Sequence, residues 1–239
     1  MTGSSIPLQY RTALIVGAGT GLGASLARTF QREGGMRVVV SSRQPERLET
    51  LAAELGTQAL ACDVGDAAVV AKLFEMARDQ LGDTPEVVVF NPSARVRGPV
   101  ASLDPAAVAQ AVNTTALGGF YVAQRAAQGM LGQGRGAILF TGASASVKGY
   151  AQSAPFAMGK FAVRGLAQSM ARELAPKGIH VGHIVIDGAI RSLANPGDPD
   201  APDALLDADA IAASYLHLLN QHRSAWSWEI ELRPWVERF

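Results

Sequence analysis

A cluster of glycines near the start of the chain constrains its fold more than any other feature. Ala13–Val16 is wholly apolar, as expected of a strand covered on both faces of a sheet. The next residues are Gly17-Ala18-Gly19-Thr20-Gly21-Leu22-Gly23. A helical pattern follows over Gly21–Glu33. Glycines here let phosphate groups approach the free N–H groups of the helix N-terminus, so this order predicts a dinucleotide-binding β-α-β unit.

Strand-like and helix-like segments alternate along the rest of the chain. The expected strands are Arg37–Val40, Gln58–Ala61, Val87–Phe90, Ala137–Thr141, Ile179–Ile186 and Ser227–Leu232. The expected helices are Pro45–Leu55, Asp66–Leu81, Pro105–Leu131 with a bend near Gly118-Gly119, Pro155–Leu174 and Ala208–Leu219. This alternation predicts an α/β fold. We expect residues 1–239 to form a single Rossmann-type doubly wound domain, with a mostly parallel sheet of about seven strands flanked by helices.

Composition excludes several classes of function. Lys plus Arg equals Asp plus Glu at 21 each, which gives no electrostatic signature of nucleic-acid binding. The sequence lacks a run of 18 apolar residues, and Met1–Arg11 has no signal-peptide core, so no membrane partner is expected. The single cysteine, Cys62, fits a reducing compartment, and no Cys/His cluster has zinc spacing. We therefore expect a cytoplasmic protein without a metal site.

The end of the second expected strand indicates which dinucleotide is bound. Sites for NAD in this architecture carry an acidic residue there, which binds the ribose hydroxyls. This chain has Ser41, Ser42 and Arg43 instead. Because a guanidinium supplies both charge and several donors to a 2′-phosphate, the sequence predicts NADP, with NADPH bound more tightly than NADH.

Further motifs extend the pattern over nearly the whole chain. They are the spacing Gly17-x3-Gly21-x-Gly23, the pair Asp63-Val64 after the third strand, Asn91 after the fourth, and Asp187-Gly188-Ala189-Ile190 after the sixth. Together they resemble the short-chain dehydrogenase/reductase family. The resemblance implies that Asp63 and Val64 contact adenine, that Asn91 borders the cofactor, and that Gly188 and Ile190 lie in the turn that holds the nicotinamide amide. It also implies an oxidoreductase that acts on a small carbonyl or alcohol substrate, as a homodimer or homotetramer.

The catalytic residues depart from the family pattern. Members carry Tyr-x-x-x-Lys on one helix, where the tyrosine transfers a proton to or from the substrate oxygen and the lysine holds the nicotinamide ribose. This chain has Phe156 and Lys160. Residues four apart share a helical face, so the geometry is kept, but a phenyl ring cannot transfer a proton. Lys160 is therefore expected to bind the cofactor.

The residues that fill the other catalytic roles of the family stay open. Counting back from Phe156 places Ala143 at the family serine, with Ser144 as its neighbour. Spacing favours Thr115 at the family asparagine, with Asn113 two residues earlier. Ser144, Tyr150 and Asn113 are the candidates for the missing catalytic groups.

Two functions fit these residues. One is an NADP(H)-dependent oxidoreductase with an altered catalytic set, which the family analogy favours. The other is a weak or inactive NADP-binding sensor or partner subunit. The loop Ser192–Leu205 is expected to cover the substrate, whose identity its composition does not specify.

The C-terminal segment is rich in aromatic residues. Trp226, Trp228 and Trp235 fall within the last fourteen residues. They fit either packing of the terminal strand against its own domain or a subunit interface, where aromatic residues are enriched.

Overall fold

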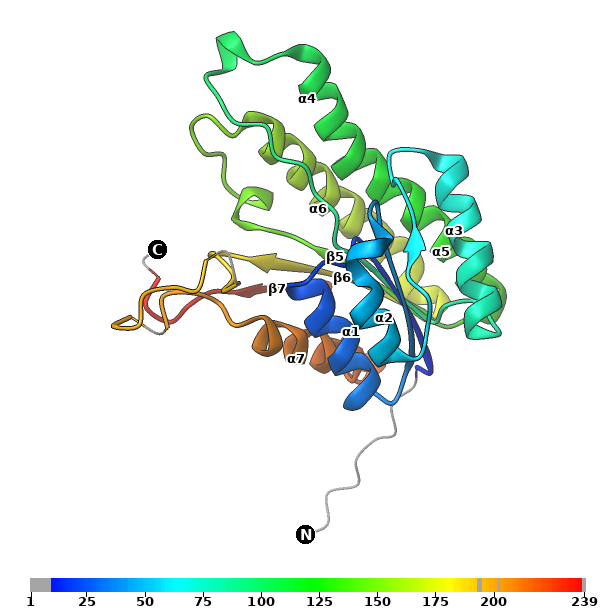
Figure 1. The fold of residues 1–239 in the computed structure, drawn as a ribbon. Coiled ribbons are helices and arrows are strands. Elements are labelled where there is room, and N and C mark those ends of the chain that lie inside the picture. The colour runs from blue at the N-terminus through cyan, green and yellow to red at the C-terminus, as the bar shows by residue number, and fades with distance from the viewer. Residues whose placement is uncertain (1–9, 193–194, 202, 238–239) are drawn as a thin grey trace.

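The computed structural model describes residues 10–192, 195–201 and 203–237 (Figure 1). Its strands are β1 (Thr12–Val16), β2 (Arg37–Ser42), β3 (Leu60–Ala61), β4 (Val87–Phe90), β5 (Gly136–Thr141), β6 (Ile179–Ile186) and β7 (Glu229–Leu232). Its α-helices are α1 (Leu22–Arg32), α2 (Glu49–Leu55), α3 (Ala67–Leu81), α4 (Pro105–Val112), α5 (Gly118–Gln133), α6 (Ala154–Leu174) and α7 (Ala208–Leu219). The ends of the predicted domain, parts of the predicted substrate loop and the last two residues of the tail lie outside the described residues.

The seven strands form one sheet in the order β3-β2-β1-β4-β5-β6-β7. Every neighbouring pair is parallel, so the predicted doubly wound α/β fold is confirmed, with a wholly parallel sheet in place of a mostly parallel one. From β1 the chain runs outward to β3, then returns to β4 on the other side of β1. Ligands of open α/β sheets bind at such a switch point, outside the carboxyl ends of the strands.

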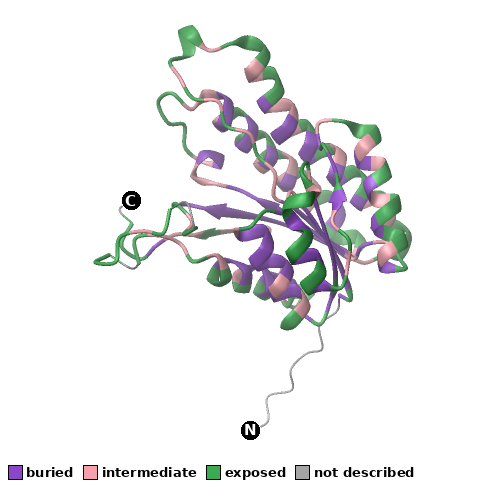
Figure 2. Ribbon diagram, viewed as in Figure 1, coloured by how far each residue is buried: buried purple, intermediate pink, exposed green. Residues whose placement is uncertain are grey.

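Helices cover both faces of this sheet. In Figure 1, α1, α2 and α7 lie on one face, and α3, α5 and α6 lie on the other. Each face has its own apolar core, the first built around helices α1, α2 and α7 and the second around α3, α5 and α6. Figure 2 shows the central strands buried between them, whereas β7 at the edge of the sheet is half-buried. Within the described ranges, no helix is long and apolar enough to span a membrane.

The long helix predicted over Pro105–Leu131 is interrupted. Asn113–Leu117 forms a π-helical turn (η3) between α4 and α5, directly before the glycines at which a bend is predicted. Gly118 faces Val64, where an added Cβ would lie 2.8 Å from the valine Cγ2. The glycine at 118 therefore allows close packing, and the π turn interrupts the α-helical hydrogen bonding directly before it.

The aromatic residues of the tail divide between the two predicted roles. Trp226 stacks on His180, with ring centroids 4.6 Å apart and planes inclined by 3°. Trp228 lies beside Arg164, whose guanidinium carbon is 5.6 Å from the ring centroid. Both tryptophans thus pack against their own domain. Trp235 is 81% exposed and remains a candidate for a subunit interface.

Candidate cofactor and active site

A cleft of about 800 Å³ opens at the carboxyl ends of β1, β2 and β4. It is lined by Gly17, Ala18, Gly19, Thr20, Ser42, Arg43, Gln44, Arg47, Leu48, Cys62, Val64, Asn91, Pro92, Ser93 and Thr114. The strand order reverses between β1 and β4 at this place, where the sequence predicts the dinucleotide.

The glycine turn is held by hydrogen bonds to the neighbouring strands. The backbone N–H groups of Gly17 and Ala18 both donate to the Ser41 carbonyl, at 2.9 and 2.8 Å. The side-chain amide of Asn91 donates a hydrogen bond to the Gly17 carbonyl at 3.0 Å. Gly17 has φ +76°, and an added Cβ would lie 2.5 Å from the Pro92 ring, so glycine is required twice over. Gly19 has no neighbour within 4 Å of its Cβ position, which leaves its backbone open to a ligand.

The second half of the glycine turn shapes the site without lining the cleft. Gly21 is the N-cap of α1, and Leu22 is buried in the core. An added Cβ at Gly23 would lie 2.7 Å from the Ala18 Cα. This glycine therefore lets α1 pack directly against the turn and aim its N-terminus at the cleft.

The end of β2 supplies positive charge to the cleft. Ser42 and Arg43 line it as predicted, and the Ser42 hydroxyl accepts a hydrogen bond from the Gln44 N–H at 3.1 Å. Arg47 lines the cleft too, a residue that the sequence analysis missed. Its position, four residues after Arg43 at the start of a predicted helix, is the signal that could have revealed it. None of the residues that line the cleft carries a carboxylate.

The loop after β3 closes another side of the cleft. Cys62 and Val64 line it, and burial raises the pKa of the Cys62 thiol to about 12, which makes it unreactive. The Asp63 carboxylate accepts a hydrogen bond from the Gly65 N–H at 3.0 Å. Asn113 donates its side-chain amide to the Gly65 carbonyl at 3.0 Å, so the structure places this catalytic candidate beside the Asp63 loop.

These observations test whether a dinucleotide fits. The cleft is large enough, bare backbone faces it at Gly19, and the two arginines that line it could pair with a phosphate group. The residues present therefore fit NADP. When bound, this cofactor donates or accepts a hydride at its nicotinamide ring.

The turn after β6 carries the other predicted cofactor contacts. An added Cβ at Gly188 would lie 2.9 Å from the Pro234 ring, and Ile190 pairs with Leu206. Asp187 stands where the family has proline, and its carboxylate lies 3.1 Å from both the Lys148 amine and the Arg233 guanidinium. Gly188 and Ile190 are thus fixed by the tail and by the loop after β6, outside the residues that line the large cleft.

A second cavity, of about 340 Å³, contains most of the catalytic candidates. It is lined by Arg95, Arg97, Ser144, Ala145, Tyr150, Ala151, Ser153 and Phe156. Ser144 and Tyr150 are thus brought to the same cavity as Phe156, whereas Asn113 is not. The two cavities meet along one segment, because residues 91–93 line the first and Arg95 and Arg97 the second.

Lys160 is 3% exposed, one turn of α6 beyond Phe156. Its amine donates to the Thr141 carbonyl at 2.7 Å, at the end of β5. Burial, and to a lesser degree the positive charge of Arg95, lower the pKa of Lys160 to about 7. The lysine can therefore lose its proton near neutral pH.

Thr115, at the family's asparagine position, has a structural role. Its hydroxyl accepts a hydrogen bond from the Ala94 N–H at 3.0 Å. Its Cβ lies 2.8 Å from the Cβ position of Gly159, the residue before Lys160. Thr115 thus connects the segment after β4, through a hydrogen bond, with the helix that carries Lys160, against which it packs.

Comparison with known proteins agrees with this geometry. Residues 11–193 match the family model described as short chain dehydrogenase. The chain is 28% identical to (+)-borneol dehydrogenase 1 of Salvia officinalis over 236 residues, 91% of this chain and 89% of the relative. It is 33% identical to a short-chain dehydrogenase from Rhodopseudomonas palustris, with a TM-score of 0.79 over 94% of this chain and 99% of the other.

The fold is also shared with a metagenomic short-chain oxidoreductase solved in complex with NADP. That match has 24% identity and a TM-score of 0.81, and covers 95% of this chain and 99% of the other. The chain belongs to the short-chain dehydrogenase family, as its motifs predict. It is an NAD(P)-dependent oxidoreductase of that family.

Two glycines of the turn are expected to respond differently to alanine. Gly23→Ala should lower the free energy of unfolding by about 1–2 kcal/mol, because the new methyl group meets the Ala18 backbone. Gly19→Ala meets no atom, so its stability should stay within ~0.5 kcal/mol of wild type, but it should weaken NADPH binding. Denaturant unfolding and nucleotide titration of both variants measure this. Equal losses of stability in the two variants would contradict the assignment of Gly23 to packing and of Gly19 to ligand binding.

Lys160 should make the stability of the cofactor-free protein depend on pH. Its pKa is about 7 when folded but about 10.4 in an unfolded chain, so the unfolded state binds more protons between these values. Stability should therefore rise with pH through this window, by up to about 1.4 kcal/mol per pH unit. Lys160→Met should flatten this rise, whereas Lys72→Met, at an exposed lysine of α3, should not. Unfolding curves at pH 7 and 9.5 measure the stability of wild type and both variants. If the stability of Lys160→Met depends on pH as that of wild type does, the lowered pKa of Lys160 is refuted.

Proposed function

We propose that this chain, acting as one dinucleotide-binding domain, is an NADP(H)-dependent oxidoreductase with an altered catalytic set. Its substrate is a small carbonyl compound or alcohol. The observation that carries the proposal is the pairing of an intact cofactor cleft with Phe156 in the family's tyrosine position. Neighbours of the same fold solved with NADP or a derivative of it support the choice of cofactor.

The cofactor cleft supplies binding and orientation. Bare backbone at Gly17 and Gly19 holds the pyrophosphate, and Arg43 and Arg47 hold the 2′-phosphate. Asp63, Val64 and Asn91 border the adenosine, and Gly188 and Ile190 border the nicotinamide. Lys160, one turn of α6 beyond Phe156, holds the ribose through the N–H groups of its amine that are not bonded to the Thr141 carbonyl.

The altered catalytic set has no phenol at position 156. Ser144 and Tyr150 line the same cavity as Phe156, and together with Ser153 they carry the hydroxyl groups of that lining. Either hydroxyl, or water, can deliver the proton to the substrate oxygen. A positioned proton donor contributes ~10²–10⁴-fold to rate, so its loss slows the reaction but leaves the hydride transfer geometry in place.

NADPH should bind more tightly than NADH. The Arg43 guanidinium can make charged hydrogen bonds to the 2′-phosphate, worth about 1.5–3 kcal/mol. Arg43→Ala should therefore weaken NADPH binding by roughly 10- to 150-fold and leave NADH binding nearly unchanged. Fluorescence titration of both nucleotides measures this. Equal affinities in the wild-type protein would overturn the assignment.

Phe156→Tyr should raise carbonyl reductase activity. The substitution adds a hydroxyl one turn before Lys160, in the cavity that Ser144 lines. Positive charges on Arg95 and Lys160 would lower the pKa of the new phenol and make it a better proton donor. NADPH oxidation over a panel of ketones and aldehydes should rise by up to ~10²–10⁴-fold.

Phe120→Tyr is the matched control, because Phe120 is an exposed phenylalanine on α5, outside the lining of the cavity. It should leave the rate unchanged. If wild type and Phe156→Tyr both bind NADPH but reduce no compound of the panel, the catalytic proposal fails. The NADP-binding sensor or partner subunit would then be the better interpretation.

The proposal includes a homodimer or homotetramer. Trp235 is exposed, and so are Met158 and Phe161, one turn apart on α6. Large exposed apolar side chains are typical of subunit interfaces. Light scattering should show an oligomer for wild type and a smaller species for Trp235→Ala or Phe161→Glu. A wild-type monomer at micromolar concentration would rule the oligomer out.

A further inference from the structure

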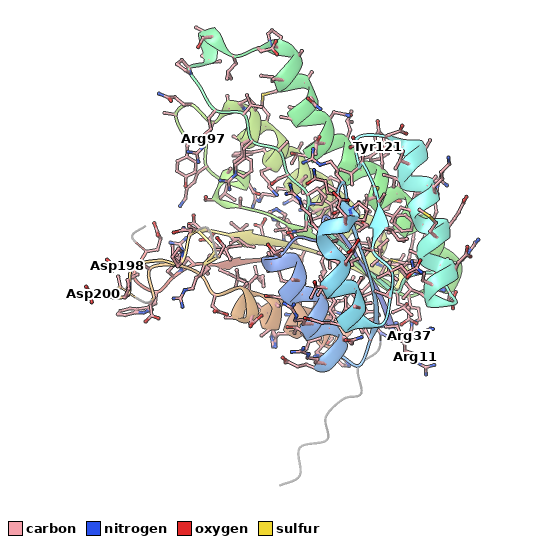
Figure 3. The ribbon with its side chains drawn as sticks, in the orientation of Figure 1. Arg11, Arg37, Arg97, Tyr121, Asp198 and Asp200 are labelled. Atoms are coloured by element: carbon pink, nitrogen blue, oxygen red, sulfur yellow. The ribbon has the colours of Figure 1, made fainter. Side chains whose placement is uncertain are left out.

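Two arginines line the smaller cavity, and the cofactor does not account for them. Arg95 and Arg97 lie on the stretch between β4 and α4, beyond the residues that line the large cleft. Figure 3 labels Arg97 on this stretch. Three hydroxyl groups, from Ser144, Tyr150 and Ser153, line the same space. A cavity of about 340 Å³ has room for a small metabolite.

Neither arginine has an acidic partner among the described residues, because no carboxylate there lies within 4 Å of the guanidinium of Arg95 or Arg97. Arg95 instead lies over the ring of Phe156, with its guanidinium carbon 4.3 Å from the ring centroid. Burial and the charge of Arg97 lower the pKa of Arg95 below its ordinary value. In the described part of the chain, the positive charge of this cavity is therefore not paired with a negative side chain.

The loop after β6 does not supply the missing negative charge. Asp198 and Asp200 lie at its outer end, well away from Arg97 in Figure 3. The Asp198 carboxylate accepts a hydrogen bond from the Asp200 N–H at 2.9 Å, within its own turn.

The arginines stand on a segment that is fixed at both ends. The Ala94 N–H donates to the Thr115 hydroxyl at 3.0 Å, just before Arg95. The Gly98 N–H donates to the Gln152 carbonyl at 3.1 Å, just after Arg97. Gln152 itself has φ +59°, the one non-glycine residue with positive φ in the described part of the chain. Backbone held in this way positions the two side chains for a ligand at little cost in conformational entropy.

We propose that Arg95 and Arg97 bind an anionic group of the substrate, so that the enzyme acts on carbonyl compounds that carry a carboxylate or a phosphate ester. Planar guanidinium groups bind both anions through paired hydrogen bonds. The hydroxyl groups of the cavity can then face the carbonyl oxygen. The Arg95 guanidinium packs on the face of the Phe156 ring, and this cation–π contact does not require a hydroxyl group on the ring.

This inference names the substrate class and rests on the proposed function. In the reaction, the carbonyl carbon receives a hydride from NADPH, and the carbonyl oxygen receives a proton from a cavity hydroxyl or water. The C=O double bond becomes a single bond, the carbonyl compound is reduced to an alcohol, and NADPH is oxidised to NADP⁺. The anionic group takes no part in bond changes and only orients the substrate.

The test compares an oxo acid with its neutral ester. 4-Oxopentanoate and methyl 4-oxopentanoate have the same ketone but differ in charge, and dihydroxyacetone phosphate provides the phosphate arm. Binding to the NADP⁺-saturated protein is measured by calorimetry, and NADPH oxidation is measured separately. At least one of the two anions should bind 10-fold or more tightly than the ester, and the tighter one identifies the class.

Arg95→Gln and Arg97→Gln should each weaken binding of that anion by about 10-fold or more. Neither should change binding of the ester. Arg78→Gln removes the same charge from the exposed surface of α3 and serves as the control for net charge. It should leave every affinity unchanged.

The outcomes separate the two proposals. If neutral ketones are reduced but the anions bind no better than the ester, the inference is wrong and the proposed function stands. If the anion binds in an Arg95-dependent way but no compound is reduced, the anion site stands and the proposed function fails. If Arg95→Gln weakens the binding of the anion and of the ester equally, Arg95 contacts the carbonyl oxygen or only stabilises the fold. That result would overturn the inference.

Discussion

The pairing of β1 with β2 on one side and β4 on the other is the constraint on which the site depends. Because all three strands are parallel, their carboxyl ends meet at one edge of the sheet. There the Ser41 carbonyl binds the N–H groups of Gly17 and Ala18, and Asn91 binds the Gly17 carbonyl. Three strands thus hold a turn that is mostly glycine. A displacement of any one of them would misalign the N-terminus of α1 relative to the cleft.

Positive charge on Arg95 and Arg97, with no carboxylate partner among the described residues, is the second property of the site. Burial is the main cause that lowers the pKa values of Lys160 and Arg95, and the charges of Arg95 and Arg97, respectively, lower them further. In the family pattern a phenol shares this environment, and its ionised form benefits from the lysine. Phe156 cannot ionise, so no group at that position balances the charge. Under the two proposals, anionic ligands balance this charge, with the phosphates of the cofactor in the first cavity and the anion of the substrate in the second.

Much of the cofactor site could be predicted from sequence because it depends on local backbone. Glycine turns, strand ends and the residues that follow them are adjacent in the chain, so Gly17, Gly19, Ser42 and Arg43 could be identified directly. Arg47 was missed because its approach to the cleft depends on how the short helical turn Pro45–Leu48 packs. The second cavity was harder to predict from the sequence. Its residues come from the segment after β4, from the connection between β5 and α6, and from α6 itself, and no spacing in the sequence brings Arg95 to Phe156.

The sequence by itself determined the fold and the family. These follow from hydrophobic periodicity and from glycine positions, both of which are local. Only the tertiary structure decided where the predicted catalytic candidates lie. It placed Asn113 against Gly65 and left Thr115 to hold Ala94, since the π turn sets which side chain faces which way. It also buried Lys160 and left Arg95 and Arg97 without a carboxylate partner among the described residues, because burial and charge balance depend on segments that meet only when the chain is folded.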